Sequence, residues 1–186
     1  MAYRMTAALI VVDMLNPYDH ADAEPLVASV LRMLDDLQAL VGAARDEGLH
    51  IVYVNDNHGD WTAGPKEIAR QALDGARPEL VEPLLPPDDA PFVLKARHSI
   101  FYETLLEYLL GREEITRLVL TGQVTEQCIL YSALDGYVRH FEVVIPTDAV
   151  AHIDDRLAQA ALVMMERNMH AQLATGPDAV LRACRA

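Results

Sequence analysis

The sequence predicts an α/β fold in which a mostly parallel sheet lies between two layers of helices. Short apolar runs alternate with longer helical segments along the whole chain. The runs are apolar at consecutive positions, which is typical of strands buried on both faces of a sheet. No repeat, linker or low-complexity segment interrupts this alternation, so we expect residues 1–186 to form a single domain.

Each expected element follows from its own pattern. The expected strands are the short aliphatic runs at 7–12, 51–54, 92–94, 117–120, 141–145 and 171–173. The expected helices, with apolar residues at helical spacing, are 26–44, 65–73, 103–110, 125–140, 154–169 and 177–183. Asp22 is a candidate N-cap of the first helix, and Gly111 is expected to end the third. Residues 78–91 contain five prolines, which predicts a surface loop.

The composition limits the partners of this protein. The chain has 28 acidic and 15 basic side chains, for a net charge of −13. Such a surface repels phosphate backbones and anionic lipids, so we expect neither nucleic acid nor a membrane as partner, which leaves a small molecule. No run approaches the roughly 18 apolar residues of a membrane span. The first residues do not resemble a signal peptide, and two cysteines are too few for a disulfide framework, so the sequence predicts a cytoplasmic protein.

Three reactive side chains follow expected strands. Asp13 follows the first strand, Lys95 follows the third, and the fourth runs into a polar turn that leads to Cys128. Each alone has an ordinary explanation, as a turn residue, a solvated cation and a small buried thiol. In open parallel sheets, however, ligands bind beyond the carboxyl ends of the strands. Their joint position at this edge predicts a catalytic site.

The chemistry of these groups favours a cysteine nucleophile. At the first turn of a helix, free N–H groups and the helix dipole favour a thiolate, and Lys95 is expected to lower the pKa of Cys128 further. Asp13 could take the thiol proton and return it later, while the N–H groups hold an oxyanion. If Thr125 caps the helix, its hydroxyl would compete for the N–H of Cys128.

Three segments carry a resemblance to a known family. ALIVVDMLN, VLKARHSIFYETLL and LVLTGQVTEQCILYSALDGYVRHFEVVIPTDAVA resemble the isochorismatase-like cysteine hydrolases, in the order found in that family. The family includes nicotinamidases, carbamoylsarcosine and ureidoacrylate amidohydrolases, biuret hydrolases and isochorismatases. The resemblance runs from the first strand to about residue 151. It implies a Rossmann-like fold with a six-stranded parallel sheet in the order 3-2-1-4-5-6.

The resemblance also implies roles for individual residues. It implies a catalytic triad of Asp13, Lys95 and Cys128, a cis peptide just before Val124, and an oxyanion hole made by the backbone N–H groups of Val124 and Cys128. Isochorismatases proper lack the cysteine, so Cys128 places this chain with the amidases. The implied activity is hydrolysis of a C–N bond in a small amide, ureido or imide compound through a thioester on Cys128. Relatives are commonly dimers or tetramers, and the apolar helices also indicate a homo-oligomer.

A metal site is expected to be absent. Nicotinamidases of this family bind a divalent metal after the second strand, through Asp-x-His and further histidines. Here Asp56 and His58 have the first spacing, but no histidine follows within the next dozen residues. Two candidate ligands are a weak signal, so the sequence predicts no metal and no other cofactor.

The substrate pocket is expected near the strand ends. Its candidate residues are Leu15, Tyr18, Asn57, His58, Trp61, Phe101 and Tyr131. Trp61 could instead anchor its loop by packing, and Tyr131 could face the core. His98 has no spacing to another candidate that assigns it a role, and Cys184 is expected to be an unreactive thiol.

Three other functions compete with a metal-free amidohydrolase. One is a metal-dependent nicotinamidase-type amidase. Another is a thiol redox protein that uses Cys128, but it needs a resolving cysteine and Cys184 is poorly placed for that role. The last is a non-catalytic binding module on the same fold, because fold does not fix function.

Overall fold

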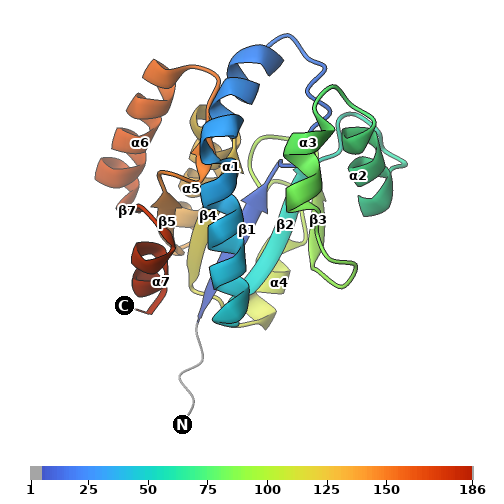
Figure 1. The fold of residues 1–186 in the computed structure, drawn as a ribbon. Helices are drawn as coiled ribbons and strands as arrows, with labels where there is room; N and C mark the ends of the chain where they lie inside the picture. Colours follow the sequence, from blue (N-terminus) through green and yellow to red (C-terminus); the bar gives the residue numbers. More distant parts are fainter. Residues whose placement is uncertain (1–5, 186) are drawn as a thin grey trace.

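The computed structural model describes residues 6–185 and contains one parallel sheet with helices on both faces (Figure 1). The strands are β1 (Ala7–Val12), β2 (His50–Asp56), β3 (Phe92–Lys95), β4 (Arg117–Gln123), β5 (Glu142–Pro146), β6 (Val150–Ala151) and β7 (Gln172–Ala174). Their order is β3-β2-β1-β4-β5-β7, and β6 pairs with β4 beside this path. The predicted fold class and strand order are therefore confirmed, with β6 as an additional short strand.

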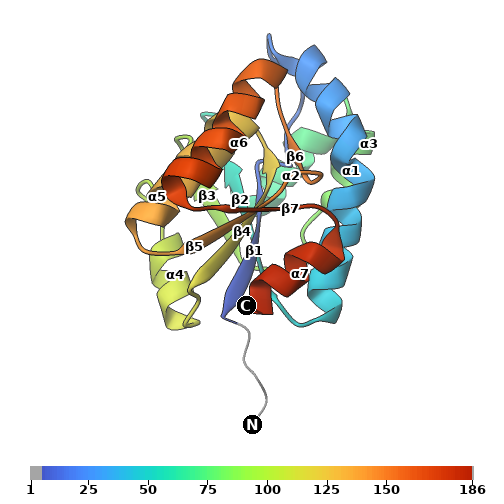
Figure 2. The same cartoon turned by 90° about the vertical axis from the view of Figure 1, so that its left-hand side faces the viewer.

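The helices form two layers, which Figure 2 shows on either side of the sheet. They are α1 (Ala23–Asp46), α2 (Pro65–Leu73), α3 (Pro78–Val81), α4 (Leu106–Arg112), α5 (Leu130–Val138), α6 (Asp155–Met169) and α7 (Pro177–Arg185). Helices α1, α3 and α7 cover one face, and α4, α5 and α6 cover the other. None of the helices in residues 6–185 combines the length and the apolar character needed to cross a membrane.

The central strand β1 explains why the sheet needs both layers. Leu9 and Val11 pack into the hydrophobic cluster on the α1 side, whereas Ile10 and Val12 pack into the cluster on the α5 side. Successive side chains of a strand point to opposite faces, so an entirely apolar run requires cover on both.

Two expectations for the middle of the chain are wrong. Residues 78–91 are not a simple loop: they begin with α3 and a turn of 3₁₀-helix (Glu82–Leu84), and Leu80, Val81 and Leu84 are buried. Proline is tolerated in the first turn of a helix, where its missing N–H is not needed. The helix expected at 103–110 is α4, which starts later and contains Gly111 in its last turn.

Two smaller differences lie at element ends. Asp22 occupies the N-cap position of α1 but makes no side-chain capping hydrogen bond. The last strand, expected at 171–173, is β7 and lies one residue later.

The two central strands approach each other closely where β4 ends. Val12 of β1 is the register partner of Gly122 of β4. Gly122 has φ +101°, and a Cβ atom there would lie 2.1 Å from the carbonyl oxygen of Val12. Only glycine fits this position. The contact brings Asp13, the next residue of the first segment, beside the turn that follows β4.

Candidate active site

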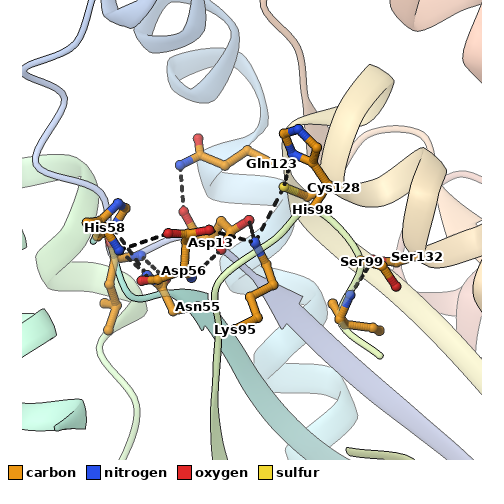
Figure 3. Close-up of polar contacts among 12 residues, drawn as sticks. Asp13, Asn55, Asp56, His58, Lys95, His98, Ser99, Gln123, Cys128 and Ser132 are labelled. Carbon is orange, nitrogen blue, oxygen red and sulfur yellow. Dashed lines mark hydrogen bonds and ion pairs between the residues drawn. The ribbon is translucent and has the colours of Figure 1, made fainter. Parts of the chain in front are cut away.

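The three reactive side chains meet beyond the carboxyl ends of β1, β3 and β4 (Figure 3). Lys95 Nζ lies 2.8 Å from Asp13 Oδ2 and 3.5 Å from Cys128 Sγ. The side chain of Lys95 is 0% exposed and that of Asp13 is 10% exposed. A carboxylate, an ammonium group and a thiol are thus in contact and almost removed from solvent.

Three hydrogen bonds from neighbouring strands fix the position of Asp13. It has φ 55°, a left-handed conformation that costs a non-glycine residue about 1 kcal/mol. Its own N–H donates to the carbonyl oxygen of Val54 (2.9 Å), and the N–H of Asp56 donates to its Oδ1 (2.7 Å). Gln123 Nε2 donates to its carbonyl oxygen (2.6 Å). These bonds from β2 and β4 fix the carboxylate in its unusual backbone geometry.

Lys95, the last residue of β3, stays charged in this site. Burial works against the ammonium, but the Asp13 carboxylate, the neighbouring Cys128 sulfur and Asp56 Oδ2 at 3.5 Å outweigh burial. Together they raise the pKa of Lys95 above its usual range. Lys95 therefore carries a positive charge at neutral pH.

Cys128 lies in a wide turn of π-helix (Thr125–Ile129) between β4 and α5, and it is buried. Burial raises the pKa of the thiol well above its usual range, the Asp13 carboxylate raises it further, and Lys95 opposes both. The expectation of a lowered pKa is therefore wrong, because desolvation and Asp13 outweigh Lys95. Cys128 therefore holds its proton at neutral pH.

The turn before Cys128 contains a cis peptide bond and has no side-chain cap. The peptide bond between Gln123 and Val124 is cis, as the resemblance implies. Thr125 does not cap the turn: its hydroxyl donates to the carbonyl oxygen of Ala151 (2.9 Å), so it does not compete for the N–H of Cys128. The N–H groups of Gln127 and Ile129 donate to the carbonyl oxygen of Val124 (3.0 and 3.1 Å), and in general the other N–H groups of a first helical turn lack a partner within the helix.

Two adjoining cavities border this cluster. The first has a volume of about 330 Å³ and is lined by Asp56, Asn57, Gly59, Trp61, Ala96, Arg97 and His98. The second, of about 430 Å³, shares Asn57, Trp61, Ala96 and Arg97 and extends to Lys95. Trp61 is 80% exposed, so it is a cavity wall and not a packing anchor.

The other pocket candidates lie elsewhere. Tyr18 is buried, its hydroxyl donates to Gln123 Oε1 (3.4 Å), and burial raises its pKa to about 12. Phe101 is buried and stacks on Phe141. Leu15 is also buried. None of these three candidates lines either cavity.

Other contacts engage Tyr131 and the two weak candidates for a metal ligand, Asp56 and His58. Tyr131 is 47% exposed and stacks on His98 rather than facing the core. His58 Nε2 lies 3.0 Å from the carbonyl oxygen of Leu15, and Asp56 Oδ1 accepts from the N–H of His58 (2.8 Å). Within residues 6–185, no three His, Cys, Asp or Glu side chains are grouped as a metal site.

Sequence reasoning missed three residues of this cluster. His98 Nδ1 lies 3.6 Å from Cys128 Sγ. Gln123 bonds to Asp13, and Asn55 fixes the loop after β1, because its Oδ1 accepts from the N–H of Leu15 (3.0 Å). The available signal was position: Gln123 ends β4, Asn55 is the next-to-last residue of β2, and His98 lies three residues after β3, all at the carboxyl ends of the strands.

Comparisons with known proteins agree with this arrangement. A model of the isochorismatase domain matches residues 7–178. The isochorismatase family protein YaaI of Bacillus subtilis is 32% identical over 168 residues, covering 90% of this chain and 93% of YaaI. The ureidoacrylate amidohydrolase RutB of Klebsiella pneumoniae is 30% identical over 183 residues, covering 83% of this chain and 77% of RutB.

A solved structure supports the fold. A cysteine hydrolase from Pseudomonas syringae superimposes with a TM-score of 0.76 at 21% identity, covering 100% of this chain and 99% of that one. The family model spans nearly the whole described chain, and the strand order agrees with the one that the motifs implied. The chain therefore belongs to the isochorismatase domain family.

Proposed function

We propose that this isochorismatase-family hydrolase cleaves a C–N bond of a small amide, ureido or imide substrate through a thioester on Cys128. The observation that carries the proposal is the contact of Asp13, Lys95 and Cys128 beside the two cavities. The similarity to a ureidoacrylate amidohydrolase supports the same class of bond. Asp13, Lys95 and Cys128 have the catalytic roles in this proposal.

Attack begins from a neutral thiol. Because the pKa of Cys128 is raised, the thiolate forms only as the sulfur approaches the substrate carbonyl. The S–H bond breaks, its proton passes to the Asp13 carboxylate, and the electron pair forms the new C–S bond. The charged ammonium of Lys95, 3.5 Å from the sulfur, stabilises the negative charge on the way.

The backbone around Cys128 then stabilises the tetrahedral intermediate. Its oxyanion accepts hydrogen bonds from the N–H groups of Val124 and Cys128. When the carbonyl re-forms, the C–N bond breaks and the leaving nitrogen takes the proton from Asp13. The acyl group stays on sulfur as a thioester.

Hydrolysis of the thioester restores the enzyme. The oxygen of a water molecule attacks the thioester carbon, and Asp13 accepts a proton from that water. Collapse of the second intermediate breaks the C–S bond, and the sulfur regains a proton from Asp13. The product leaves as a carboxylic acid, or as a carbamic acid if the substrate is a ureide.

The cavities fit a small substrate. Their volumes, about 330 and 430 Å³, are near the lower end for small-molecule sites. In this proposal Trp61 and Asn57 form the wall that faces the substrate, since both line the two cavities.

The test combines mass spectrometry with product detection. The protein is incubated briefly with a panel of small amides, ureides and nicotinamide, and its intact mass and the released ammonia are measured. We expect an acyl adduct on Cys128, and ammonia release that is lost in Cys128→Ala but kept in the matched control Cys184→Ala. Hydrolysis that survives in Cys128→Ala would overturn the thioester route. Reversible oxidation of Cys128 without hydrolysis would favour the thiol redox alternative.

A further inference from the structure

The sulfur of Cys128 has a second nitrogen neighbour that the mechanism above does not use. His98 Nδ1 lies 3.6 Å from Sγ, and Lys95 Nζ lies 3.5 Å from it. Figure 3 shows the sulfur between the imidazole ring and the ammonium. His98 also lines the smaller cavity, so it is on the side of the sulfur where a substrate would lie.

The hydrogen count decides the direction of this contact. In the proposed attack the thiol proton passes to Asp13, which leaves a thiolate with no hydrogen to donate. Lys95 is an ammonium group and can only donate. The thiolate sulfur therefore accepts from both nitrogens, so in this step Nδ1 of His98 carries a hydrogen and Nε2 carries the lone pair of the neutral ring.

Neighbouring contacts hold His98 in this position. Its ring stacks on Tyr131, with the ring centroids 5.4 Å apart and the planes inclined by 19°. The next residue, Ser99, is buried, and its hydroxyl donates to the carboxylate of Asp135 on α5. The N–H of Ile100 donates to Ser132 Oγ (3.1 Å), also on α5. The loop after β3 is thus fastened to the helix that follows Cys128.

We propose that His98 is a catalytic residue that donates a hydrogen bond from Nδ1 to the sulfur of Cys128 as negative charge develops there. The proposal rests on the nucleophilic role of Cys128 given above. As the S–H bond breaks, the proton goes to Asp13, and the electron pair carries negative charge on the sulfur until it has formed the C–S bond. His98 keeps its own proton throughout and shares the stabilisation of the thiolate with Lys95.

Two variants separate the hydrogen bond from the stacking. His98→Phe keeps a flat ring against Tyr131 and a similar volume at the cavity, but it has no N–H group. His98→Asn loses the ring but places an amide N–H near the position of Nδ1. His50→Phe is the matched control, because His50 starts β2 at the opposite edge of the sheet.

The first readout is the alkylation rate of Cys128 by iodoacetamide near neutral pH, followed by peptide mass spectrometry. This reaction forms a C–S bond and releases iodide, and it needs no substrate. Cys128 is mostly protonated near neutral pH. Loss of a hydrogen-bond donor therefore lowers the fraction of Cys128 present as thiolate, and this effect exceeds the gain in nucleophilicity of the remaining thiolate. We expect about a three- to tenfold slower reaction in His98→Phe, a rate within about twofold of the wild type in His98→Asn, and no change in the control.

Two results would overturn the proposal. One is an alkylation rate in His98→Phe equal to or faster than that of the wild type. The other is an equally slow rate in His98→Asn while both variants have wild-type circular dichroism and melting temperature, which would assign His98 a role in stacking alone.

Turnover of an amide from the panel supplies the second readout. We expect kcat to fall about three- to tenfold in His98→Phe with KM changed less than about twofold, because the hydrogen bond strengthens as charge develops. A protein that hydrolyses no member of the panel would count against the proposed function. The alkylation ranking would still decide the role of His98, so the two failures are distinguishable.

Discussion

Two cavities of about 430 Å³ lie at opposite ends of the strands, one at their carboxyl ends (the carboxyl edge) and one at their amino ends (the amino edge). They differ in how deeply their charged side chains are buried. The one at the carboxyl edge extends to Lys95, whose buried ammonium contacts Asp13 and Cys128. The one at the amino edge is lined by Arg117 and Glu142 among others. Arg117 pairs with Glu142, but the side chain of Glu142 is 65% exposed.

The comparison shows that volume alone does not distinguish a catalytic site. Both hollows could hold the same small molecule. Of these two hollows, the one at the carboxyl ends of the strands borders ionisable groups that are buried together, and there Asp13 raises the pKa values of Lys95 and Cys128. At the amino edge, solvent screens the ion pair between Arg117 and Glu142 and so weakens it. This coupled burial distinguishes the end of the sheet at which we propose the active site.

The largest expected effect is on turnover. Cys128→Ala should lower hydrolysis by about 10⁴-fold or more, because the step that forms the C–S bond is removed. The fold should persist, since a small apolar side chain fits the buried turn. Ammonia release and circular dichroism measure the two quantities. Turnover above about one hundredth of the wild-type rate would contradict the comparison between the edges.

A matched pair of lysine and arginine substitutions tests the burial of charge. Lys95→Met leaves Asp13 buried without its cation, so the free energy of unfolding should fall by about 3–5 kcal/mol. Arg117→Met at the amino edge should cost less than about 1 kcal/mol, because Glu142 remains hydrated. Urea denaturation measures both. An equal decrease in the free energy of unfolding in both variants would show that the charge on Lys95 is no more buried, in effect, than the charge on Arg117.

The pH dependence of stability sharpens the comparison further. The folded state raises the pKa values of Cys128 and Lys95 above their ordinary 9.0 and 10.5. Above about pH 9 the unfolded chain therefore loses a thiol proton that the folded chain keeps, and stability falls by up to about 1.4 kcal/mol per pH unit.

Cys128→Ala should remove this first alkaline loss. Between about pH 9 and pH 10 the wild type should lose about 1 kcal/mol more than the variant, as measured by urea denaturation across that range. Cys184→Ala is a weak control only, because burial also raises the pKa of that thiol. Parallel stability curves for the wild type and Cys128→Ala would show that the raised pKa is wrong.

The smallest expected effect is on substrate affinity. Trp61→Ala should raise KM about three- to tenfold and change the free energy of unfolding by less than about 0.5 kcal/mol, because the side chain is exposed and lines both cavities. Tyr137→Ala, which alters the amino-edge hollow, should leave KM unchanged. Steady-state kinetics decides, and a shift in KM with Tyr137→Ala alone would place the substrate at the other edge.

Much of this arrangement could be predicted from local sequence. The apolar run of β1 required a sheet covered on both faces, and Asp13, Lys95 and the turn before Cys128 were predictable because each follows a strand. The state of the thiol was not predictable in the same way. It depends on how much water the fold removes from Cys128 and on how close Asp13 lies, and both are properties of packing.

The residues that escaped prediction share a cause. His98 has no useful spacing to any partner in the sequence, and its contact with Cys128 arises because its loop is fastened to α5. The exposure of Trp61 depends on a loop whose composition allows either orientation. The prolines around Leu80 led to the prediction of a loop, although proline is also compatible with the first turn of a helix, as in α3.

The close approach of β1 and β4 at Gly122 also has a consequence for biosynthesis. Asp13 bonds to Asp56 across 43 positions of the chain but to Gln123 across 110. The longer loop costs more chain entropy to close, and N-terminal segments leave the ribosome first. We therefore expect Cys128 to pass through a period as an ordinary thiol on the nascent chain. Asp13 comes close to Cys128 only when β4 pairs with β1. The unusual reactivity of Cys128 should therefore develop only after the central part of the sheet has folded.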